Sequence, residues 1–482
     1  MAEGKLNPRE QARLEEKKKN QKARTKYIVI GIVVLLLVAA IIFVNSRAFA
    51  DGIPALRVGD TSYTIADVNY EYRRAYMQFT QSYSDYLSVF MDTSLPLDEQ
   101  ECMLDPDGGT WDDYFKSQAE SSLTQLTALY KEAVAKGYII TEDDQAEIDN
   151  TISTYELYAG LYSYTLDGYL AANFGAGNNE KTVRRHLAQE ILVDRYLNEL
   201  YDGYTFTDAE KDVYYTEHAE TLNKVNYLSS YTTTSEDENA PQTAQAVLDA
   251  MEGGEADDFR AAALAVKDAE AVQSSNSQTS FLSQFDGSVT EDELTYGTVF
   301  THDTDSGSYA IFVLGLDDND YNTVSVRHIL IKAEDTDGDG EYSDEEKQTA
   351  YDALTAIQDE WLSGEATEDS FAALAGQYSQ DDGSSANGGL YEDIYKGQMV
   401  AEFNDFCFDE HQSGDYGIVY GESTQYAGYH LIYFVGADGE LYSRTLADSN
   451  LRSEAYNTQV EELLSAYTPQ RTFAWRYVMS GT

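Results

Sequence analysis

Hydrophobic and polar positions alternate with two different periods, and the change of period divides the chain into regions. From Val68 to Tyr201 apolar residues recur at helical spacing, with breaks near Pro96, over 105–109 and over 175–179. Shorter runs rich in β-branched and aromatic residues, typical of strands, cover 224–228, 309–315, 325–331 and 427–434. A further helical pattern covers 449–466. These patterns predict an α+β chain whose first half is mainly helical.

Composition and charge narrow the class of protein. With 482 residues, only six prolines and 33 glycines, the chain has room for two to four folded domains. The first 26 residues hold nine Lys or Arg and four Glu, a net charge of +5, which leaves −58 for the remainder. So acidic a body repels nucleic acid, and we exclude nucleic-acid binding.

An uncharged run of 18 residues, 27–44, follows this basic tail (1–26). Its length suits a transmembrane helix, and the basic flank predicts a cytoplasmic N-terminus with the body outside the cell membrane. The alternative is a cleaved signal peptide, with Ala48-Phe-Ala50 as the cleavage site. Cys102 and Cys407 lie far apart in the sequence, and we expect no disulfide between them.

The stretch 322–437 carries a series of motifs in a fixed order. They are, in chain order, Ser325-Val-Arg-His-Ile-Leu-Ile, Phe371-Ala-Ala-Leu-Ala, Tyr378-Ser-Gln-Asp, Gly388-Gly, Gly397-Gln-Met-Val-Ala-Glu-Phe and Ala427-Gly-Tyr-His-Leu-Ile-Tyr-Phe. Together they resemble the parvulin family of peptidyl-prolyl isomerases. The resemblance implies an α+β domain that catalyses cis/trans isomerisation of X-Pro bonds and requires no cofactor for catalysis.

The same resemblance implies the site residues. His328 and His430, on the first and last strands, correspond to the family's histidine pair, and Asp381 to the position that orients it. Thr424 corresponds to a further catalytic position, although this motif has one residue more than the common pattern. The proline pocket would comprise Leu390, Met399 and Phe403, the last two on one face of a helix beginning near Gln398.

The regions on either side of this domain carry weaker resemblances. Residues 53–222, which begin with a hairpin over 55–65, resemble the helical chaperone region of the SurA and PrsA foldases, and 445–482 would pack on that region. Tyrosines recur there, as Tyr70, Tyr72, Tyr76, Tyr83 and Tyr86. They form either an amphipathic core face or an adaptable surface for client chains.

Residues 223–320 contain an echo of the parvulin pattern. Asp258-Phe-Arg-Ala-Ala-Ala-Leu-Ala is similar to Ser370-Phe-Ala-Ala-Leu-Ala, and the run from Tyr309 to Gly315 to the run from Tyr429. This alignment puts Tyr227 at the position of His328 and Ala310 at that of His430. We therefore predict a degenerate parvulin-like domain that is inactive; the alternative is an unrelated α+β linker domain.

An acidic loop follows the first strand of the parvulin-like domain. It satisfies D-x-D-x-D-G-x5-E, with calcium ligands predicted at Asp335, Asp337, Asp339, Glu341 and Glu346. The prediction is a structural Ca²⁺ site, and the alternative is a solvated acidic loop. In either case the loop would repel a phosphoserine, so a phosphate-directed isomerase is not expected.

The sequence thus predicts a membrane-anchored extracytoplasmic foldase, whose partners are unfolded or partly folded exported proteins that contain proline. Two alternatives stay open. One is a non-catalytic holdase or scaffold that uses the parvulin fold to bind chains. The loop over 388–395, which differs from the family pattern, favours this alternative. The other is a calcium-dependent surface adhesion module.

Overall fold

The computed structural model describes residues 30, 32–38, 43, 47–105, 108–235, 239–338, 340–423, 426–437 and 439–479. It divides into two compact units, one of residues 1–204 and 454–482 and the other of residues 205–453. The predicted basic tail, 1–26, and most of the predicted membrane segment, 27–44, lie outside the described residues. Among the residues described, none of the helices combines the length and the apolar character needed to span a bilayer.

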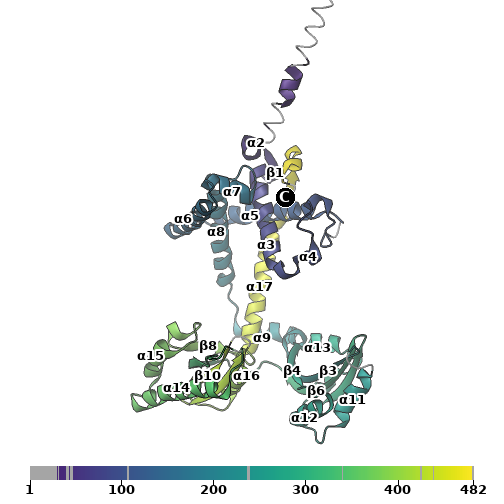
Figure 1. Ribbon diagram of the computed structural model, residues 1–482, viewed down its shortest axis with the longest axis vertical. Coiled ribbons are helices and arrows are strands. Elements are labelled where there is room, and N and C mark those ends of the chain that lie inside the picture. The colour runs from purple at the N-terminus through teal and green to yellow at the C-terminus, as the bar shows by residue number, and fades with distance from the viewer. Residues whose placement is uncertain are drawn as a thin grey trace, which may run out of the picture. The chain divides into compact units, whose positions relative to one another are not determined.

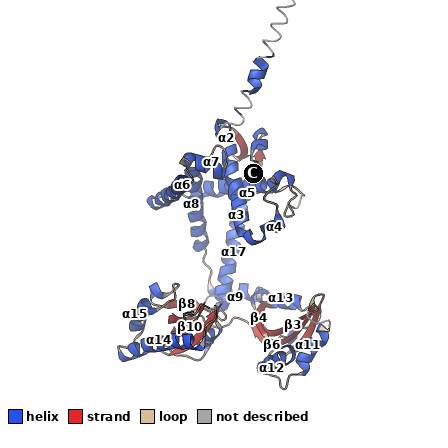
Figure 2. Cartoon of the chain, in the orientation of Figure 1, coloured by secondary structure: helices blue, strands red, loops and turns tan. Residues whose placement is uncertain are grey.

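The first unit is mainly helical (Figures 1 and 2). Its helices are α2 (Arg47–Gly52), α3 (Ile65–Ser82), α4 (Leu87–Phe90), α5 (Trp111–Ala135), α6 (Glu142–Leu161), α7 (Leu166–Phe174), α8 (Glu180–Gly203) and the C-terminal part of α17 (Tyr442–Ser465). Strands β1 (Pro54–Val58) and β2 (Thr61–Thr64) form the predicted hairpin, and β11 (Pro469–Arg471) pairs with β1. The C-terminal segment is therefore part of this unit's small sheet.

The long helices of this unit begin at side chains that cap them. Thr64, Thr110 and Thr141 each accept a hydrogen bond from the backbone N–H three residues on, and an Asp at that position bonds back to the threonine. Such a capping box satisfies two backbone donors that the first turn leaves free, and it fixes where each helix starts. Asp67, which caps α3 in this way, is almost fully buried.

Aromatic residues build the core of the first unit. Phe79, Trp111 and Phe115 pack with ring centroids 5.0–5.8 Å apart, between α3 and α5. The tyrosines of this region differ in burial. Tyr70 and Tyr72 are buried in the core, whereas Tyr86, beyond the end of the helix, is 66% exposed.

The second unit contains two antiparallel sheets of four strands (Figure 2). After α9 (Asp208–Glu217) and α10 (Ala219–Leu222), the first sheet comprises β3 (Lys224–Thr233), β4 (Val272–Ser277), β5 (Val299–Thr304) and β6 (Gly307–Asp317) in the order β4-β3-β6-β5. Its helices are α11 (Ala240–Asp249), α12 (Ala256–Lys267) and α13 (Gln278–Gln284).

The second sheet has the order β8-β7-β10-β9. It comprises β7 (Val324–Lys332), β8 (Leu390–Ile394), β9 (Tyr416–Ser423) and β10 (Tyr426–Gly436), with helices α14 (Asp344–Ser363), α15 (Glu368–Tyr378) and α16 (Ala401–Phe408). Because strand side chains alternate between the two faces, Ile329 and Leu431 pack on α14 and α15, while Val326 and Ile432 pack on Phe403 and Cys407 of α16. Cys102 and Cys407 are both buried and unbonded.

The two sheets share one strand order, with the first and last strands of each paired in the middle. In the first sheet Tyr227 pairs with Val313 and lies beside Phe281 and Phe285. Ala310 lies on the opposite face, with Leu228 and Phe312, so its predicted alignment with His430 was wrong. Alternation places Ile311, not Ala310, on the face of Tyr227. The mixed helix-and-sheet fold class is confirmed.

Candidate active site

Two buried histidines meet on one face of the second sheet. His328 lies opposite Ile432 and His430 opposite Leu330, so the two imidazoles are diagonal neighbours across the antiparallel pair β7 and β10. Their Nδ1 atoms are 3.1 Å apart, and the residues are only 3% and 4% exposed. The ring of Phe403 packs edge-on against both.

A carboxylate completes the far side of His328. Its Nε2 lies 3.1 Å from Oδ2 of Asp381 and 3.0 Å from Oγ of Ser384. The same carboxylate oxygen accepts hydrogen bonds from the hydroxyls of Ser384, at 2.5 Å, and Tyr391, at 3.1 Å. Asp381 thus serves as a common acceptor for three donors.

The turn that carries these groups depends on two glycines. Gly388 and Gly389 have φ of +65° and +73°, a region that L side chains disfavour. A Cβ on Gly389 would lie 2.2 Å from the carbonyl oxygen of His328, whose own N–H donates to the Gly389 carbonyl at 2.8 Å. The Gly-Gly motif therefore lets the turn approach β7 closely enough for Ser384 to reach the histidine.

The far side of His430 is closed by a tyrosine. The Tyr426 hydroxyl lies 3.0 Å from His430 Nε2. Gly421 on β9 leaves room for this ring, because a Cβ there would lie 2.8 Å from Nε2. Tyr426, His430, His328 and Asp381 thus form a continuous chain of hydrogen bonds.

The two ends of that chain have different charges. The hydrogen bond from His328, with those from Ser384 and Tyr391, holds the pKa of Asp381 well below its usual range, so Asp381 is an anion and His328 Nε2 must donate to it. Burial, helped by the neighbouring His328, lowers the pKa of His430 to about 3, so this ring is neutral. A neutral imidazole has one donor and one acceptor, so His430 donates at one nitrogen and accepts at the other, between His328 and Tyr426.

A cavity of about 340 Å³ opens above the chain of hydrogen bonds. Its polar side is formed by His328, Asp381, Asp382, Tyr391, Tyr426 and His430, and its apolar side by Leu330, Met399, Val400 and Phe403. Small-molecule and peptide sites typically combine such an apolar wall with a few convergent polar groups. The cavity has the size and polarity to hold a proline ring with the peptide bond that precedes it.

The structure brings most of the predicted site residues together. His328, Asp381, Met399, Phe403 and His430 all line the cavity. Leu390 is not among the described residues that line it, and its neighbour Tyr391 is. Met399 precedes α16, which begins at Ala401 rather than near Gln398. Thr424 lies outside the described residues.

Sequence reasoning missed three members of this site. Ser384 and Tyr426 carry no spacing signal in a single chain, because a hydroxyl in a turn or on a strand has many ordinary roles. Tyr391 could have been found: it is next to the proposed pocket residue Leu390, and only the parity of β8 decides which of the two faces inward.

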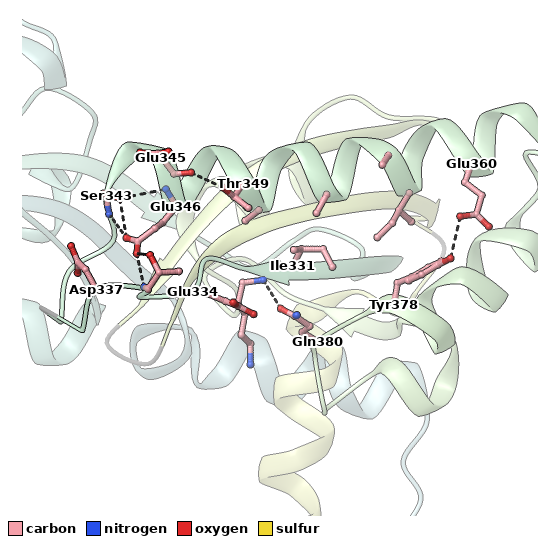
Figure 3. Close-up of a pocket in the computed structure, with 16 residues that line it drawn as sticks. Ile331, Glu334, Asp337, Ser343, Glu345, Glu346, Thr349, Glu360, Tyr378 and Gln380 are labelled. Carbon is pink, nitrogen blue, oxygen red and sulfur yellow. Dashed lines mark hydrogen bonds between the residues drawn. The ribbon is translucent and has the colours of Figure 1, made fainter.

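The acidic loop lies next to a larger groove on the α14 side of the same sheet. This groove, of about 840 Å³, has Ile331, Ala350 and Ile357 on its walls and shares only Lys332 with the histidine cavity. Figure 3 shows it running along α14, with Asp337 and Glu346 at one end and Glu360 at the other. None of the described residues that line this groove is a predicted catalytic residue.

The predicted calcium ligands are partly gathered. Carboxylate oxygens of Asp335, Asp337 and Glu346 lie within 4.8 Å of one another, while Asp339 is outside the described residues. Glu346 also caps α14, accepting hydrogen bonds from Thr336 and Ser343 that lower its pKa to about 2. A calcium ion would have to share or replace these bonds, so the calcium site stays a prediction.

Comparison with known proteins identifies the domain. The family model described as PPIC-type PPIASE domain matches residues 309–436, about a quarter of the chain. Parvulins are the isomerases of this type, so the chain contains a parvulin-type peptidyl-prolyl isomerase domain, and the resemblance drawn from the motifs is confirmed. No curated protein is similar enough to the chain to match.

Several solved structures are similar over most of the chain. PrsA from Bacillus subtilis is 16% identical, with 77% of this chain and 91% of PrsA covered and a TM-score of 0.28. The foldase protein PrsA from Streptococcus pneumoniae is 12% identical, with 76% and 92% covered and a TM-score of 0.27. A solved structure described as one of the SurA-like chaperones PEB4 and Cj1289 of Campylobacter jejuni is 11% identical, with 82% of this chain and 95% of that chain covered and a TM-score of 0.19.

Proposed function

We propose that this protein is a foldase whose domain 322–437 catalyses cis/trans isomerisation of X-Pro bonds. The observation that carries the proposal is the series of hydrogen bonds from Tyr426 through the two histidines to Asp381, beside a cavity with an apolar wall. The uncatalysed reaction must cross a barrier of about 18–20 kcal/mol, since rotation removes the resonance of the peptide bond. No nucleophile or metal is needed to lower this barrier.

The cavity supplies two things that the rotation requires. Met399, Phe403 and Leu330 offer apolar contacts that hold the proline ring while the preceding carbonyl turns. The hydrogen-bonded histidine pair and the anchored carboxylate give the polar side a fixed hydrogen-bonding pattern, which need not reorganise as the amide twists. Binding that favours the twisted amide over both planar forms accelerates the rotation.

A second surface supports a role in holding client chains. At the end of α6 and in the turn after it, a cluster of apolar and aromatic side chains is 43–69% exposed: Leu157, Tyr158, Leu161, Tyr162 and Tyr164. Contiguous exposed apolar residues mark interaction surfaces more often than isolated ones do. We propose that this α6 cluster binds unfolded segments of proteins that contain proline.

We also propose that the protein acts outside the cell membrane, anchored by the apolar run 27–44. The support comes from the sequence, in the length of that run and the basic tail before it. Protease protection of membrane vesicles that contain the full chain tests the proposal. Digestion of the body only in vesicles with the outer face exposed is expected, and digestion from the cytoplasmic side would contradict it.

Isomerisation of a short X-Pro peptide by the full chain tests the catalytic proposal. We expect catalysis by the wild-type chain and its loss in His430→Ala. His302→Ala is the matched control, because His302 lies on β5 of the first sheet, bonded to Ser288. Absence of catalysis in a folded wild-type chain would favour the alternative, a holdase that binds chains without turnover.

A further inference from the structure

A buried histidine in the first unit lacks a partner on one side. His186 lies on α8, is 0% exposed, and stacks on Tyr70 of α3 with ring centroids 4.3 Å apart. Its Nε2 is 3.0 Å from Oδ1 of Asp67. Its Nδ1 is buried without a hydrogen-bond partner among the described residues.

Asp67 determines which nitrogen of His186 carries the proton. The other oxygen of Asp67 accepts the cap hydrogen bonds from Thr64, which hold the carboxylate in place. Asp67 also pairs with Arg185, so all its other partners are donors and it acts as an acceptor toward His186. His186 Nε2 therefore donates, and the lone pair of Nδ1 points the other way.

Two carboxylates lie close to His186. Glu71, one helical turn after Asp67 on α3, has Oε1 3.7 Å from His186 Nδ1. Glu190 follows His186 by one turn on α8. One ligand atom from each of Glu71, His186 and Glu190 lies within 4.8 Å of the other two.

An arginine already contacts this cluster. Arg74 pairs with Glu190 and lies 3.9 Å from Glu71, and its side chain is 43% exposed. It makes no hydrogen bond to His186 Nδ1, which has no partner among the described residues. A cavity of about 310 Å³ is lined by Glu71, Arg74 and Glu190. A bound cation would have to displace Arg74 from the two carboxylates.

We propose that Glu71, His186 and Glu190 bind one divalent transition-metal cation of the zinc class. An ion about 2.1 Å from both His186 Nδ1 and Glu71 Oε1 would subtend an angle of about 120° at their present separation of 3.7 Å, within the range of zinc sites. Mixed imidazole and carboxylate ligands suit this class of ion. Asp67 would hold the metal-binding tautomer of His186, as carboxylates commonly do behind metal-bound histidines. A fourth position would face the cavity.

Zinc binding to the full chain tests the site. The acidic loop is first removed as a competing site with Asp335→Asn and Asp337→Asn, and Zn²⁺ affinity is measured by competition with a chromophoric chelator. We expect one equivalent bound per chain, with affinity reduced at least about tenfold by His186→Gln and by Glu190→Gln. Glu199→Gln, an exposed position on the same helix, is the control and should leave the affinity unchanged.

Cobalt provides a second measurement that reports the ligands directly. Co²⁺ bound by nitrogen and oxygen ligands absorbs visible light, and we expect this absorption in the chain with the loop substitutions and its loss with His186→Gln. Because His186 is fully buried, circular dichroism must show that the variant is folded; if it is not, Glu190→Gln alone decides. Failure to bind Zn²⁺ stoichiometrically, or binding that neither substitution weakens, would overturn the proposal.

Discussion

The two sheets of the second unit have the same strand order, but the corresponding face is polar and open in one sheet and covered by core side chains in the other. In the sheet β8-β7-β10-β9 the centre of this face holds His328 and His430 under an open cavity. In the sheet β4-β3-β6-β5 the centre holds Tyr227 and Ile311, and they are covered by Phe281 of α13 and by Phe285, which follows that helix. One arrangement keeps polar groups in a space that a peptide can enter, and the other fills that space with core.

This difference shows that the fold alone does not make an isomerase site. Burying an imidazole costs free energy unless its nitrogens have partners, and the second sheet supplies these through Asp381 and Tyr426. The first sheet has Tyr227 and Ile311 at the corresponding positions, where only the Tyr227 hydroxyl needs a partner, and Asn276 donates to it. We therefore propose that 223–320 is a parvulin-like domain without catalytic function, as the sequence led us to expect.

Replacing the two histidines with apolar residues, as in the first sheet, should have the largest effect on catalysis. We expect His328→Leu combined with His430→Ile to reduce catalysis of X-Pro isomerisation by at least about 100-fold, since the polar side of the cavity is lost. The folded state should persist, because Asp381 keeps its hydrogen bonds from Ser384 and Tyr391 when the histidines are replaced. Tyr227→Leu with Ile311→Val, at the corresponding positions of the first sheet, should leave catalysis unchanged. Wild-type activity in the double histidine variant would contradict the claim that the histidine pair distinguishes the two sheets.

Removing one phenylalanine from each sheet should separate catalysis from stability. Phe403→Ala and Phe281→Ala each delete a buried ring, and we expect each to lower the free energy of unfolding by about 3–5 kcal/mol. Only Phe403→Ala should also abolish catalysis, because Phe403 lines the cavity. Urea denaturation and peptide isomerisation, measured on the same samples, check both parts. Equal loss of activity in the two variants would mean that stability alone explains it.

Adding one methyl group at Gly389, in the turn next to the site, should reduce both stability and catalysis. Gly389→Ala would place a Cβ against the carbonyl of His328 at a positive φ, so we expect destabilisation of about 1–3 kcal/mol together with reduced catalysis. Gly315→Ala, also at a positive φ but in open space, is the control in the first sheet and should cost less and spare catalysis. Thermal unfolding and isomerisation assays distinguish the two.

The dependence of stability on pH should reflect the neutral histidine. Because the pKa of His430 is about 3 in the folded chain and about 6.5 when unfolded, protons bind preferentially to the unfolded chain between these values. The contribution of His430 is therefore complete above pH 6.5 and is lost as the pH falls toward 3. Denaturation from pH 8 to pH 4 should show a smaller decrease in His430→Gln than in the wild type. An identical slope would contradict the assigned pKa.

Calcium should have the smallest effect. If the acidic loop binds Ca²⁺, calorimetry should show binding at about 10⁻⁴–10⁻³ M, the range of extracellular modules, and a raised melting temperature. Asp335→Asn should remove both. Catalysis should change little, because the loop lies at the groove on the other side of the sheet (Figure 3). No binding at 10 mM Ca²⁺ would leave the loop as a solvated acidic segment whose Glu346 caps α14.

Much of this fold could be predicted because the informative residues lie on regular elements. His328 and His430 sit on strands whose β-branched runs are evident, and the capped helices begin at Thr-x-x-Asp patterns. The sequence is least informative at positions where one residue changes the face. Tyr391, next to the predicted Leu390, lines the cavity, and Ile311 rather than Ala310 shares the face of Tyr227, beside the irregular pairing between Asn226 and Tyr227. Which face of the sheet a strand residue points to depends on how the strand pairs in the folded domain, and a single sequence does not contain that information.

The most direct test of the central claim is exchange spectroscopy by NMR on a peptide with one X-Pro bond, in the presence of the full chain. This measurement separates binding, seen as chemical-shift changes, from interconversion of cis and trans peptide. We predict exchange between the two forms far faster than the tens of seconds of the free peptide, lost in the His328→Leu, His430→Ile variant. Chemical-shift changes without accelerated exchange in the wild-type chain would contradict the account and show a domain that binds proline segments without turning them over.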